Sequence, residues 1–408
     1  MDGKIVVALG GCAVLAGIAY ILQGGKKTKD SQTESSGVPG LVNLGNTCYL
    51  NSVLQAMASV SLFVSWIETC NEKSSQKLGK LTSELSKFML ILSQPCHEQE
   101  SYDPTSIFTS LYSHGWVISH EQQDAHEMFQ VLTSTLAHEE EYALQRTLNS
   151  VLLNQDGLAI DDESIVLRSG VKASKVQRKS WSPFAGLFAN QLSCKKCLNK
   201  YPVKFEVFDT VSLSLSSNFL FANCTLEGLI RNFMCTEMLE SSECSACGAG
   251  NGANEKTRLL KKLYIGKMPQ CLCFHINRTY WQNNGVPYKN DTFVQFSETL
   301  NIEQYLYKHM RCATEIPGIV GLWSDQDGRL SKEGVTTQNR LAGNTIYSLV
   351  AVIVHLGEAV GRGHYITYRK SNTCWHLVSD EITRCVPLSH VLKSTAYMLF
   401  YERTHLSA

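Results

Sequence analysis

The chain has 408 residues, with 37 Lys or Arg and 37 Asp or Glu, so its formal net charge is zero. This balance gives no indication of nucleic-acid binding, and no run of like charges marks an acidic or basic tail. With 44% hydrophobic and 18% charged residues, the composition is that of a globular protein with a large core. The 15 cysteines could form disulfides, but their odd number and two Cys-x-x-Cys pairs favour reduced thiols and a bound metal.

The N-terminal region contains an uncharged apolar stretch at residues 5–22, after a short tail at residues 1–4. At about 1.5 Å per residue, this stretch just crosses a bilayer core as a helix. Lysines at residues 26–29 predict that the rest of the chain faces the cytosol. A cleaved signal peptide would carry its basic residues before the apolar run, and the glycines would weaken a buried helix in a soluble protein. We therefore predict an uncleaved transmembrane helix, followed by a flexible linker at residues 23–38.

The next stretch, residues 40–55, reads Gly-Leu-Val-Asn-Leu-Gly-Asn-Thr-Cys-Tyr-Leu-Asn-Ser-Val-Leu-Gln. The apolar spacing after the cysteine predicts a helix that starts near Cys48 and is capped by Asn46 or Thr47. A helix N-terminus favours the thiolate, which makes Cys48 a candidate nucleophile, and the amide of Asn43 is a candidate donor to an oxyanion. The alternative is that Cys48 is a small buried hydrophobic residue.

Helical spacing continues beyond this stretch. Residues 59–95 predict a helical lobe, and Pro104 marks a further helix start. Residues 121–130 predict an amphipathic helix, with Asp124 on a different side from the apolar residues. Residues 149–182 lack a clear pattern and are interpreted as an insertion.

Two Cys-x-x-Cys pairs then suggest one tetrahedral zinc site, with ligands Cys194, Cys197, Cys244 and Cys247. Redox-active or free cysteines are the alternative. Runs at residues 201–208 and 211–215 predict strands, which the metal would clamp into a protruding finger. Four thiolates leave no open position, so the predicted zinc is structural and no catalytic cofactor is expected.

The C-terminal half predicts a mainly antiparallel sheet. Its predicted strands lie within residues 261–278, 292–296, 347–356, 364–368 and 397–401. Residues 318–344 are polar and predict a surface loop.

Residues 361–368 read Gly-Arg-Gly-His-Tyr-Ile-Thr-Tyr and open one of these strands. The glycines, Gly363 among them, allow a substrate backbone to approach closely. His364 is therefore a candidate general base for Cys48, and His355 is its rival on residue type alone.

The three stretches together resemble the ubiquitin-specific proteases. Residues 40–55 match that family's cysteine box, residues 122–127 its Gln-Gln-Asp-Ala-x-Glu box, and Gly-His-Tyr at residues 363–365 its histidine box. The split zinc site is also frequent in the family. This resemblance implies Cys48 as nucleophile and Asn43 as oxyanion donor, and it selects His364 over His355 as the base.

The same resemblance implies how substrate is bound. It assigns to Asp124 the holding of the basic tail of ubiquitin, with support from Gln122 and Gln123. It also places Gly363 and Tyr365 beside the substrate.

The third catalytic position departs from the family pattern. An aspartate or asparagine normally follows a tryptophan and orients the histidine. Alignment from Trp375 puts Ser379 at that position and Asp380 directly after it. A serine hydroxyl can hydrogen-bond the imidazole but has no negative charge to stabilise an imidazolium. Asp380 therefore remains a candidate for a supporting or alternative partner of His364.

The implied fold is an α+β, papain-like hand in a catalytic domain at residues 39–404. Its helical thumb would cover about residues 48–150, its zinc-bound β fingers 186–260 and its antiparallel β palm 261–404. The implied activity is cysteine-type deubiquitination, the hydrolysis of isopeptide bonds at the C-terminal glycine of ubiquitin. Ubiquitin, polyubiquitin chains and ubiquitinated membrane proteins are the implied partners.

A Cys–His–Ser arrangement behind an N-terminal anchor resembles membrane-anchored members of this family. That resemblance implies a single-pass protein of the mitochondrial outer membrane, with its catalytic domain in the cytosol and a role opposing mitophagy. The alternative is a catalytically weak, membrane-tethered ubiquitin-binding module, weakened by Ser379.

Overall fold

The computed structural model describes residues 37–73, 80–96, 100–119, 121–153, 181–215, 224–248, 256–281, 285–307, 345–359 and 362–404. The predicted transmembrane helix at residues 5–22 and the predicted surface loop at residues 318–344 lie outside these ranges, as do nearly all of the linker and residues 154–180. Within the described ranges, no single helix is long and apolar enough to cross a membrane. The first two helices pass that test only as a pair, which is bent by 92°.

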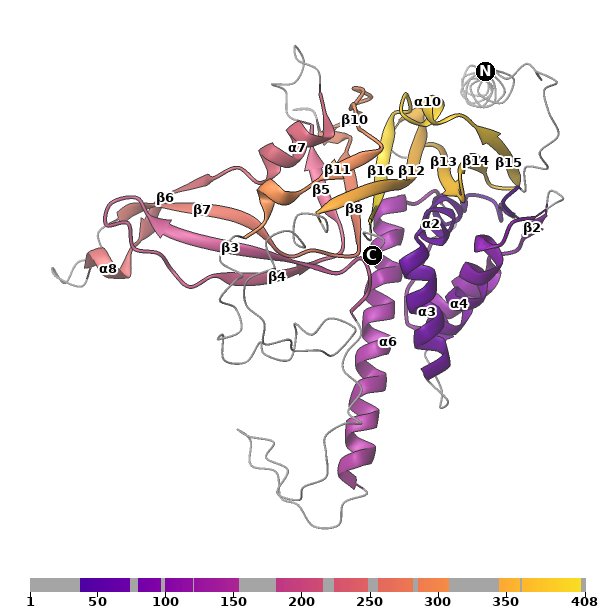
Figure 1. Ribbon diagram of the computed structural model, residues 1–408, viewed down its shortest axis with the longest axis horizontal. Coiled ribbons are helices and arrows are strands. Elements are labelled where there is room, and N and C mark those ends of the chain that lie inside the picture. Colours follow the sequence, from indigo (N-terminus) through magenta and orange to yellow (C-terminus); the bar gives the residue numbers. More distant parts are fainter. Residues whose placement is uncertain are drawn as a thin grey trace, which may run out of the picture.

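The helical lobe surrounds one completely buried helix, α2 (Cys48–Ala58). Figure 1 shows the other helices of the lobe around it, with the long α6 extending away from the body of the molecule. The lobe also contains α3 (Ser61–Lys73), α4 (Lys80–Ser93), α5 (Thr105–Ser113), α6 (Ala125–Leu153) and the short parallel strands β1 (Gly40–Leu41) and β2 (Ser101–Tyr102). The predicted helical lobe is therefore confirmed, and α6 runs five residues into the stretch interpreted as an insertion, which was predicted to start at residue 149.

Gln55 is a buried polar residue of α2, and both ends of its amide have partners, since an unsatisfied polar group in a core is costly. Gln55 Nε2 donates to the carbonyl of Pro39 at 2.8 Å, and Gln55 Oε1 accepts from Arg369 at 2.7 Å. Arg369 is itself buried and also donates to the carbonyls of Leu92 and Ala58, at 3.0 and 3.3 Å. One guanidinium thus satisfies backbone groups near the ends of α2 and α4 from the neighbouring sheet.

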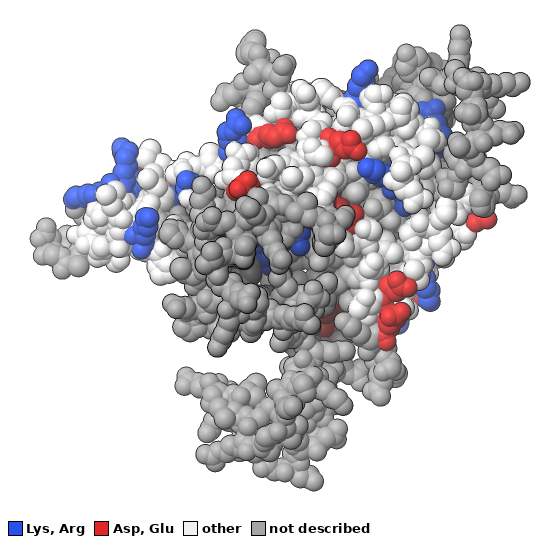
Figure 2. Space-filling model, in the orientation of Figure 1, with Lys and Arg blue, Asp and Glu red and all other residues white. Residues whose placement is uncertain are grey.

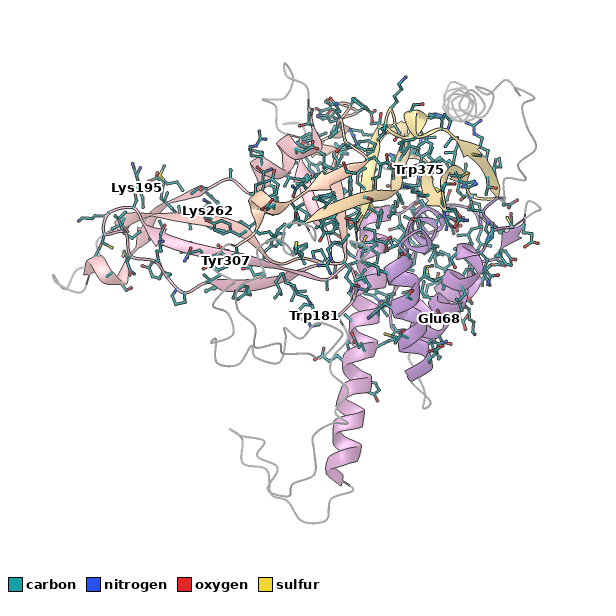
Figure 3. The ribbon with its side chains drawn as sticks, viewed as in Figure 1. Glu68, Trp181, Lys195, Lys262, Tyr307 and Trp375 are labelled. Carbon is teal, nitrogen blue, oxygen red and sulfur yellow. The ribbon has the colours of Figure 1, made fainter. Side chains whose placement is uncertain are left out.

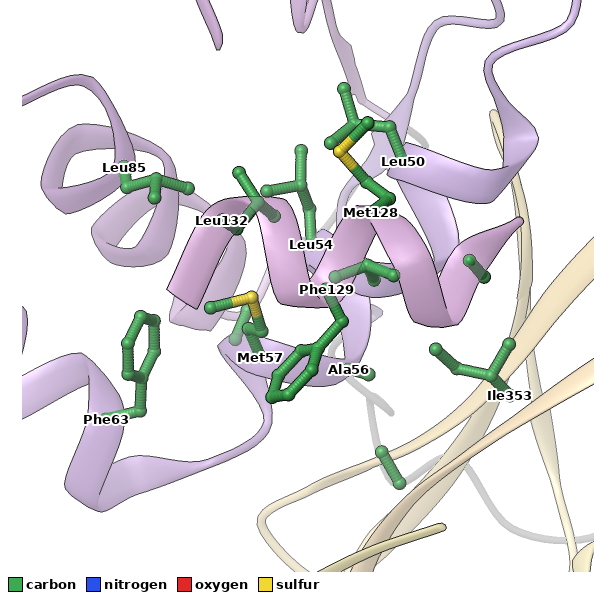
Figure 4. Close-up of a cluster of buried hydrophobic side chains, with 14 of the residues drawn as sticks. Leu50, Leu54, Ala56, Met57, Phe63, Leu85, Met128, Phe129, Leu132 and Ile353 are labelled. Carbon is green, nitrogen blue, oxygen red and sulfur yellow. The ribbon is translucent and has the colours of Figure 1, made fainter. Parts of the chain in front are cut away.

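The core of the lobe forms where α2 meets α6. Figure 4 shows Leu54 and Met57 of α2 beside Phe129 and Leu132 of α6, with Ile353 approaching from the sheet. All five side chains have no exposed area. The predicted inward orientation of Phe129 and Leu132 is confirmed, and this packing fixes α2 against the sheet.

The palm is an eight-stranded sheet in the order β15-β14-β13-β12-β16-β8-β5, with β11 pairing β12 off this path. Its pairs are antiparallel except β5 with β8, so the predicted mainly antiparallel sheet is confirmed. The strands are β5 (Val211–Ser214), β8 (Cys271–Asn277), β11 (Thr299–Asn301), β12 (Ile346–Ala359), β13 (Arg362–Ser371), β14 (Cys374–Ser379), β15 (Ile382–Val386) and β16 (Ala396–Arg403).

The strand predicted at residues 292–296 is wrong. This segment makes only an isolated bridge, from Gln295 to Thr225. Val294 and Phe296 are buried on either side of Gln295. The alternation of apolar and polar residues therefore reflects alternate burial of an extended segment, not pairing in a β-sheet.

A separate four-stranded sheet forms the finger, in the order β4-β3-β7-β6. Its strands are β3 (Gly186–Cys194), β4 (Lys204–Phe208), β6 (Glu237–Glu243) and β7 (Lys256–Lys267). The run predicted at residues 211–215 is a strand, but as β5 it joins the palm instead of the finger. Strand β7 crosses the boundary predicted between finger and palm at residues 260/261. The finger sheet therefore extends to Lys267, beyond the range predicted for it.

Short elements complete the described chain. They are α7 (Leu226–Phe233), α8 (Ser245–Gly248), the hairpin of β9 (Thr279–Trp281) and β10 (Pro287–Lys289), the turn η2 (Glu303–Tyr305) and α10 (Leu388–Val391). Figure 2 shows Lys and Arg side chains on the finger end of the molecule. Part of this charge is neutralised, because Arg258 lies 2.9 Å from Glu240 and Lys261 lies 3.5 Å from Glu237.

Candidate active site

Cys48 is the first residue of α2, as the sequence predicts. Thr47 is the N-cap residue, one of the two predicted, but its side chain makes no capping bond to the helix. Its hydroxyl instead accepts from the backbone N–H of Leu44 at 3.0 Å and lies 3.3 Å from Asn43 Oδ1. Thr47 therefore shapes the loop that precedes the cysteine.

The environment of Cys48 differs from the expected one. Burial, with a smaller contribution from the charge of Asp380, raises the pKa of its thiol to about 11. The backbone amide of Tyr365 opposes this shift by hydrogen bonding to the sulfur, as do the amides at the helix start. The helix start thus favours the thiolate as predicted, but loss of water outweighs it, and the net shift favours the neutral thiol. Cys48 is a neutral thiol at pH 7 and needs a base.

His364 lies on β13, next to the residue whose amide contacts the thiol. Its Nε2 lies 2.9 Å from Ser379 Oγ and 3.9 Å from Asp380 Oδ2. Burial lowers the pKa of His364, and the charge of Asp380 opposes that shift in part. At pH 7 the ring is therefore neutral. With Nε2 held by Ser379, Nδ1 is the ring nitrogen left to act as a base.

Asp380 occupies the turn between β14 and β15, with a positive φ of 51°. Its carboxylate accepts from Asn43 Nδ2 and from Asn51 Nδ2, each at 2.8 Å. Its carbonyl accepts from the N–H of Leu41 at 2.9 Å. Asp380 thereby fastens the loop before Cys48, and α2 itself, to the palm.

Asn43 is held at both ends of its amide. Its Oδ1 accepts from the backbone N–H groups of Gly45 and Thr47, at 3.0 and 3.3 Å. Its Nδ2 uses one hydrogen on Asp380, which leaves the second available, since an amide carries two. The side chain is thus fixed close to the start of the nucleophile helix.

Only the second half of the second family box lies on the predicted helix. Helix α6 begins only at Ala125, and Asp124 caps it. Asp124 Oδ1 accepts from the N–H groups of His126 and Glu127, at 2.7 and 3.2 Å, and Tyr397 donates its hydroxyl hydrogen to Oδ2. An aspartate is a favoured N-cap, which explains why the helix begins after Asp124 and not at residue 121.

The two glutamines of this box have different partners. Gln122 Nε2 donates to the carbonyl of Gly363 at 2.7 Å, and Gln122 Oε1 accepts from the N–H of Gly363 at 2.8 Å. Gln123 Nε2 instead donates within its own loop, to Ser119 Oγ at 2.7 Å and to the carbonyl of Glu121 at 3.3 Å. Of the two glutamines, Gln122 alone bonds the histidine strand β13 in these contacts.

A cavity of about 400 Å³ opens beside Asp124. Its walls include His126 and His275, whose rings stack with centroids 4.0 Å apart. His275 Nδ1 lies 2.9 Å from Ser212 Oγ, and burial lowers the pKa of both histidines. These residues were not predicted, because a pairing between α6 and β8 leaves no local spacing in the sequence.

His355, the rival histidine, lies on β12, directly opposite Tyr365 of the histidine strand. It is 7% exposed, and its ring packs against Tyr365 with centroids 4.6 Å apart. Burial and nearby Lys289 lower its pKa to about 4. It therefore stays neutral as a packing residue, whereas His364 has the Ser379 partner.

The four predicted zinc ligands converge at the end of the finger. Figure 3 labels Lys195, which follows Cys194, at this far end. The sulfurs of Cys194 and Cys247 are 3.8 Å apart, those of Cys197 and Cys244 are 3.7 Å apart, and all four lie within 4.8 Å of one another. Tetrahedral zinc with Zn–S bonds of about 2.3 Å requires S–S distances of about 3.8 Å. The donor set fits structural zinc.

Removing a ligand should therefore destabilise the finger without altering the chemistry. We expect purified protein to carry about one zinc per chain, and Cys194→Ser to lower the melting temperature by about 5–10 °C. The turnover number per folded molecule should be unchanged. The matched control is Cys235→Ser, since Cys235 is exposed and outside the cluster. Metal analysis that finds no zinc in folded, active protein would refute the site.

Comparison with known proteins agrees with this geometry. The sequence profile described as "Ubiquitin carboxyl-terminal hydrolase" matches residues 39–401. Ubiquitin carboxyl-terminal hydrolase 30 of Xenopus tropicalis is 32% identical over 450 residues, which cover 96% of this chain and 86% of the relative. The human protein of the same name is 30% identical over 461 residues, covering 96% and 89%.

Solved structures share the fold. A SAGA deubiquitinating module with Ubp8, Sgf11, Sus1 and Sgf73, bound to monoubiquitin, matches with a TM-score of 0.60 at 21% identity, over 97% of this chain and 76% of the matched chain. The same module bound to ubiquitin aldehyde matches with a TM-score of 0.57 at 22% identity, over 96% and 75%. From the profile, the relatives and the fold together, the chain belongs to the ubiquitin carboxyl-terminal hydrolase family and is a cysteine deubiquitinase of the ubiquitin-specific protease type.

Proposed function

We propose that this chain is a membrane-anchored deubiquitinase that cleaves the isopeptide bond after the C-terminal glycine of ubiquitin. The observation that carries the mechanism is the 2.9 Å contact between His364 Nε2 and Ser379 Oγ, one residue from the amide that contacts Cys48. Ser379 holds the N–H tautomer at Nε2, so that Nδ1 presents its lone pair to the thiol.

In the proposed reaction, His364 takes the proton of Cys48 and the sulfur attacks the glycine carbonyl. The second N–H of Asn43 Nδ2 and nearby backbone amides stabilise the oxyanion. The protonated His364 then gives its proton to the leaving lysine amine, and an acyl-enzyme remains. A water molecule, deprotonated by His364, hydrolyses the thioester and releases ubiquitin.

Substrate binding is proposed for the surface around the cavity. Asp124 borders the cavity, and its negative charge suits the basic tail of ubiquitin. Gln123 would support the same tail, and Gly363 and Tyr365 would lie along it. Solved neighbours of the same fold bound to monoubiquitin and to ubiquitin aldehyde support ubiquitin as the ligand, alone or in chains.

The proposed location is the mitochondrial outer membrane, with one span at residues 5–22 and the catalytic domain in the cytosol. There the enzyme would remove ubiquitin from membrane proteins and oppose mitophagy. The apolar sequence of residues 5–22, with lysines directly behind it, supports the anchor. Imaging a fluorescent protein fused to residues 1–37 tests the location, and a diffuse signal would reject it.

Deleting residues 1–36 should release a soluble enzyme with unchanged kinetics on soluble ubiquitin substrates. The reason is that the described fold begins at Gly37, whose N–H and carbonyl bond Cys96 at 2.8 and 3.0 Å. Fractionation of cells and turnover of a ubiquitin amide measure the two effects. The matched control deletes residues 24–36 alone, which should leave the enzyme in the membrane. A collapse of activity after the longer deletion would show that the N-terminal segment is part of the catalytic fold.

A further inference from the structure

Strand β13 extends past its neighbour β14 at the active site. The strand starts at Arg362, but its first pair with β14 is Thr367 with Val378. On its other side β13 pairs β12, where His364 lies opposite Leu356. Backbone groups alternate in direction along a strand, so those of Gly363 and Tyr365 share the side of Thr367 and point away from β12. Partners other than β14 must satisfy them.

The helical lobe supplies these partners in order along the strand. The Gln122 amide bonds both the N–H and the carbonyl of Gly363, at 2.8 and 2.7 Å. A side-chain amide carries one carbonyl and N–H donors, so Gln122 reproduces the pair that a neighbouring strand would make. Two residues on, the backbone amide of Tyr365 bonds the sulfur of Cys48. His364 lies between these two contacts.

The opposite side of Gly363 is closely packed. A Cβ added to Gly363 would lie 2.3 Å from His355 Nε2 and 2.3 Å from the carbonyl oxygen of Leu356, so only glycine fits. Behind it, the buried ammonium of Lys289 donates to the carbonyls of His355 and Gly357, at 3.1 and 2.6 Å. Gly363 thus packs against the palm on one side and is hydrogen-bonded to Gln122 on the other.

We propose that Gln122 is a positioning residue for the Cys48–His364 pair and does not bind ubiquitin. Its amide sets the free edge of β13, and that edge places both the imidazole of His364 and the amide of Tyr365 at the sulfur. This revises the substrate-binding role expected for Gln122 from the sequence. The inference rests on the proposed function of Cys48 and His364.

The test is Gln122→Met, which keeps side-chain volume but removes both bonds to Gly363. The reactivity of Cys48 toward iodoacetamide is measured by mass spectrometry of its peptide from pH 5 to 10, a readout that needs no ubiquitin. The ionisable groups that interact with the thiol, namely Asp380, Tyr49 and Tyr365, are all retained in this variant, as is His364. We expect the alkylation rate at pH 7 to fall about tenfold, since one or two hydrogen bonds are lost.

Turnover separates positioning from binding. For Gln122→Met we expect kcat on a ubiquitin amide to fall with the alkylation rate and KM to stay constant. The Kd for ubiquitin should also be unchanged when the substitution is added to Cys48→Ala. Glu121→Gln is the matched control, because Glu121 is an exposed residue of the same loop, and it should leave every value unchanged. Melting temperature and zinc content verify the fold.

Two results would overturn the inference: a weaker Kd and higher KM with normal alkylation, or no change in any value. Wild type is compared with His364→Ala in the same alkylation assay. Equal rates in those two proteins would reject the Cys48–His364 pair itself, which is a failure of the proposed function and not of Gln122.

Discussion

Replacing Cys48 with alanine should abolish hydrolysis of a fluorogenic ubiquitin amide, lowering kcat/KM by about 10⁴-fold or more. The sulfur forms the covalent intermediate, and no other described thiol lies on α2. Ubiquitin binding should survive, because Cys48 is 4% exposed and alanine fits the space that its side chain leaves. A ubiquitin propargyl probe should label wild type only. Retained turnover would exclude Cys48 as nucleophile, and an unlabelled wild type would favour the binding-module alternative.

The pH dependence follows from two shifts with known signs. The pKa of the thiol is raised to about 11, and that of His364 lies below its usual value of about 6.5 because of burial. A neutral imidazole is needed as the base, so kcat/KM should be flat near pH 7 and fall as pH drops through a value below 6.5. In His364→Ala the base is gone, and alkylation of Cys48 should instead rise with pH toward about 11.

The second large effect separates the roles of Ser379 and Asp380. Ser379→Ala removes the contact to His364 Nε2, and we expect turnover to fall about 10–100-fold, the worth of one hydrogen bond to a group that becomes charged. Asp380→Ala removes the acceptor that holds the side chains of Asn43 and Asn51. Because Asn43 is the proposed oxyanion donor, we expect turnover to fall about 10²–10³-fold, as when such a donor is lost. Both variants should stay more active than Cys48→Ala.

A double-mutant cycle makes this comparison decisive. If Asp380 acts by holding Asn43, then Asn43→Ala should match Asp380→Ala, and the double variant should be little worse than either single one. Ser379→Ala should then add independently to Asn43→Ala. The contrary outcome is a silent Ser379→Ala beside an Asp380→Ala that resembles His364→Ala. The orienting residue would then be Asp380, and the alignment from Trp375 would be wrong.

Local chemistry made some of the site predictable. The start of α2 at Cys48 follows from apolar spacing, and the zinc ligands follow from the two Cys-x-x-Cys pairs. The pKa of Cys48 could not be predicted in this way. Its sign depends on how completely palm and helices exclude water, and that is a property of tertiary packing.

The fold shows the same division. The run at residues 211–215 could be predicted as a strand from its residues, but its pairing with β8 is a long-range choice that propensity does not encode. The capping of α6 by Asp124, by contrast, can be predicted from the sequence, because an aspartate directly before an apolar periodic segment is a helix start signal.

The buried guanidinium of Arg369 has a consequence for how the enzyme can move. It joins β13, which carries His364, to α2 and α4 through three hydrogen bonds deep in the core. Opening a hinge between sheet and helices would break these bonds and leave a buried positive charge without them. Rigid-body opening would therefore be costly in free energy. Amides of α2 and of central β13 should consequently exchange with deuterium in a single cooperative event, at the rate of global unfolding.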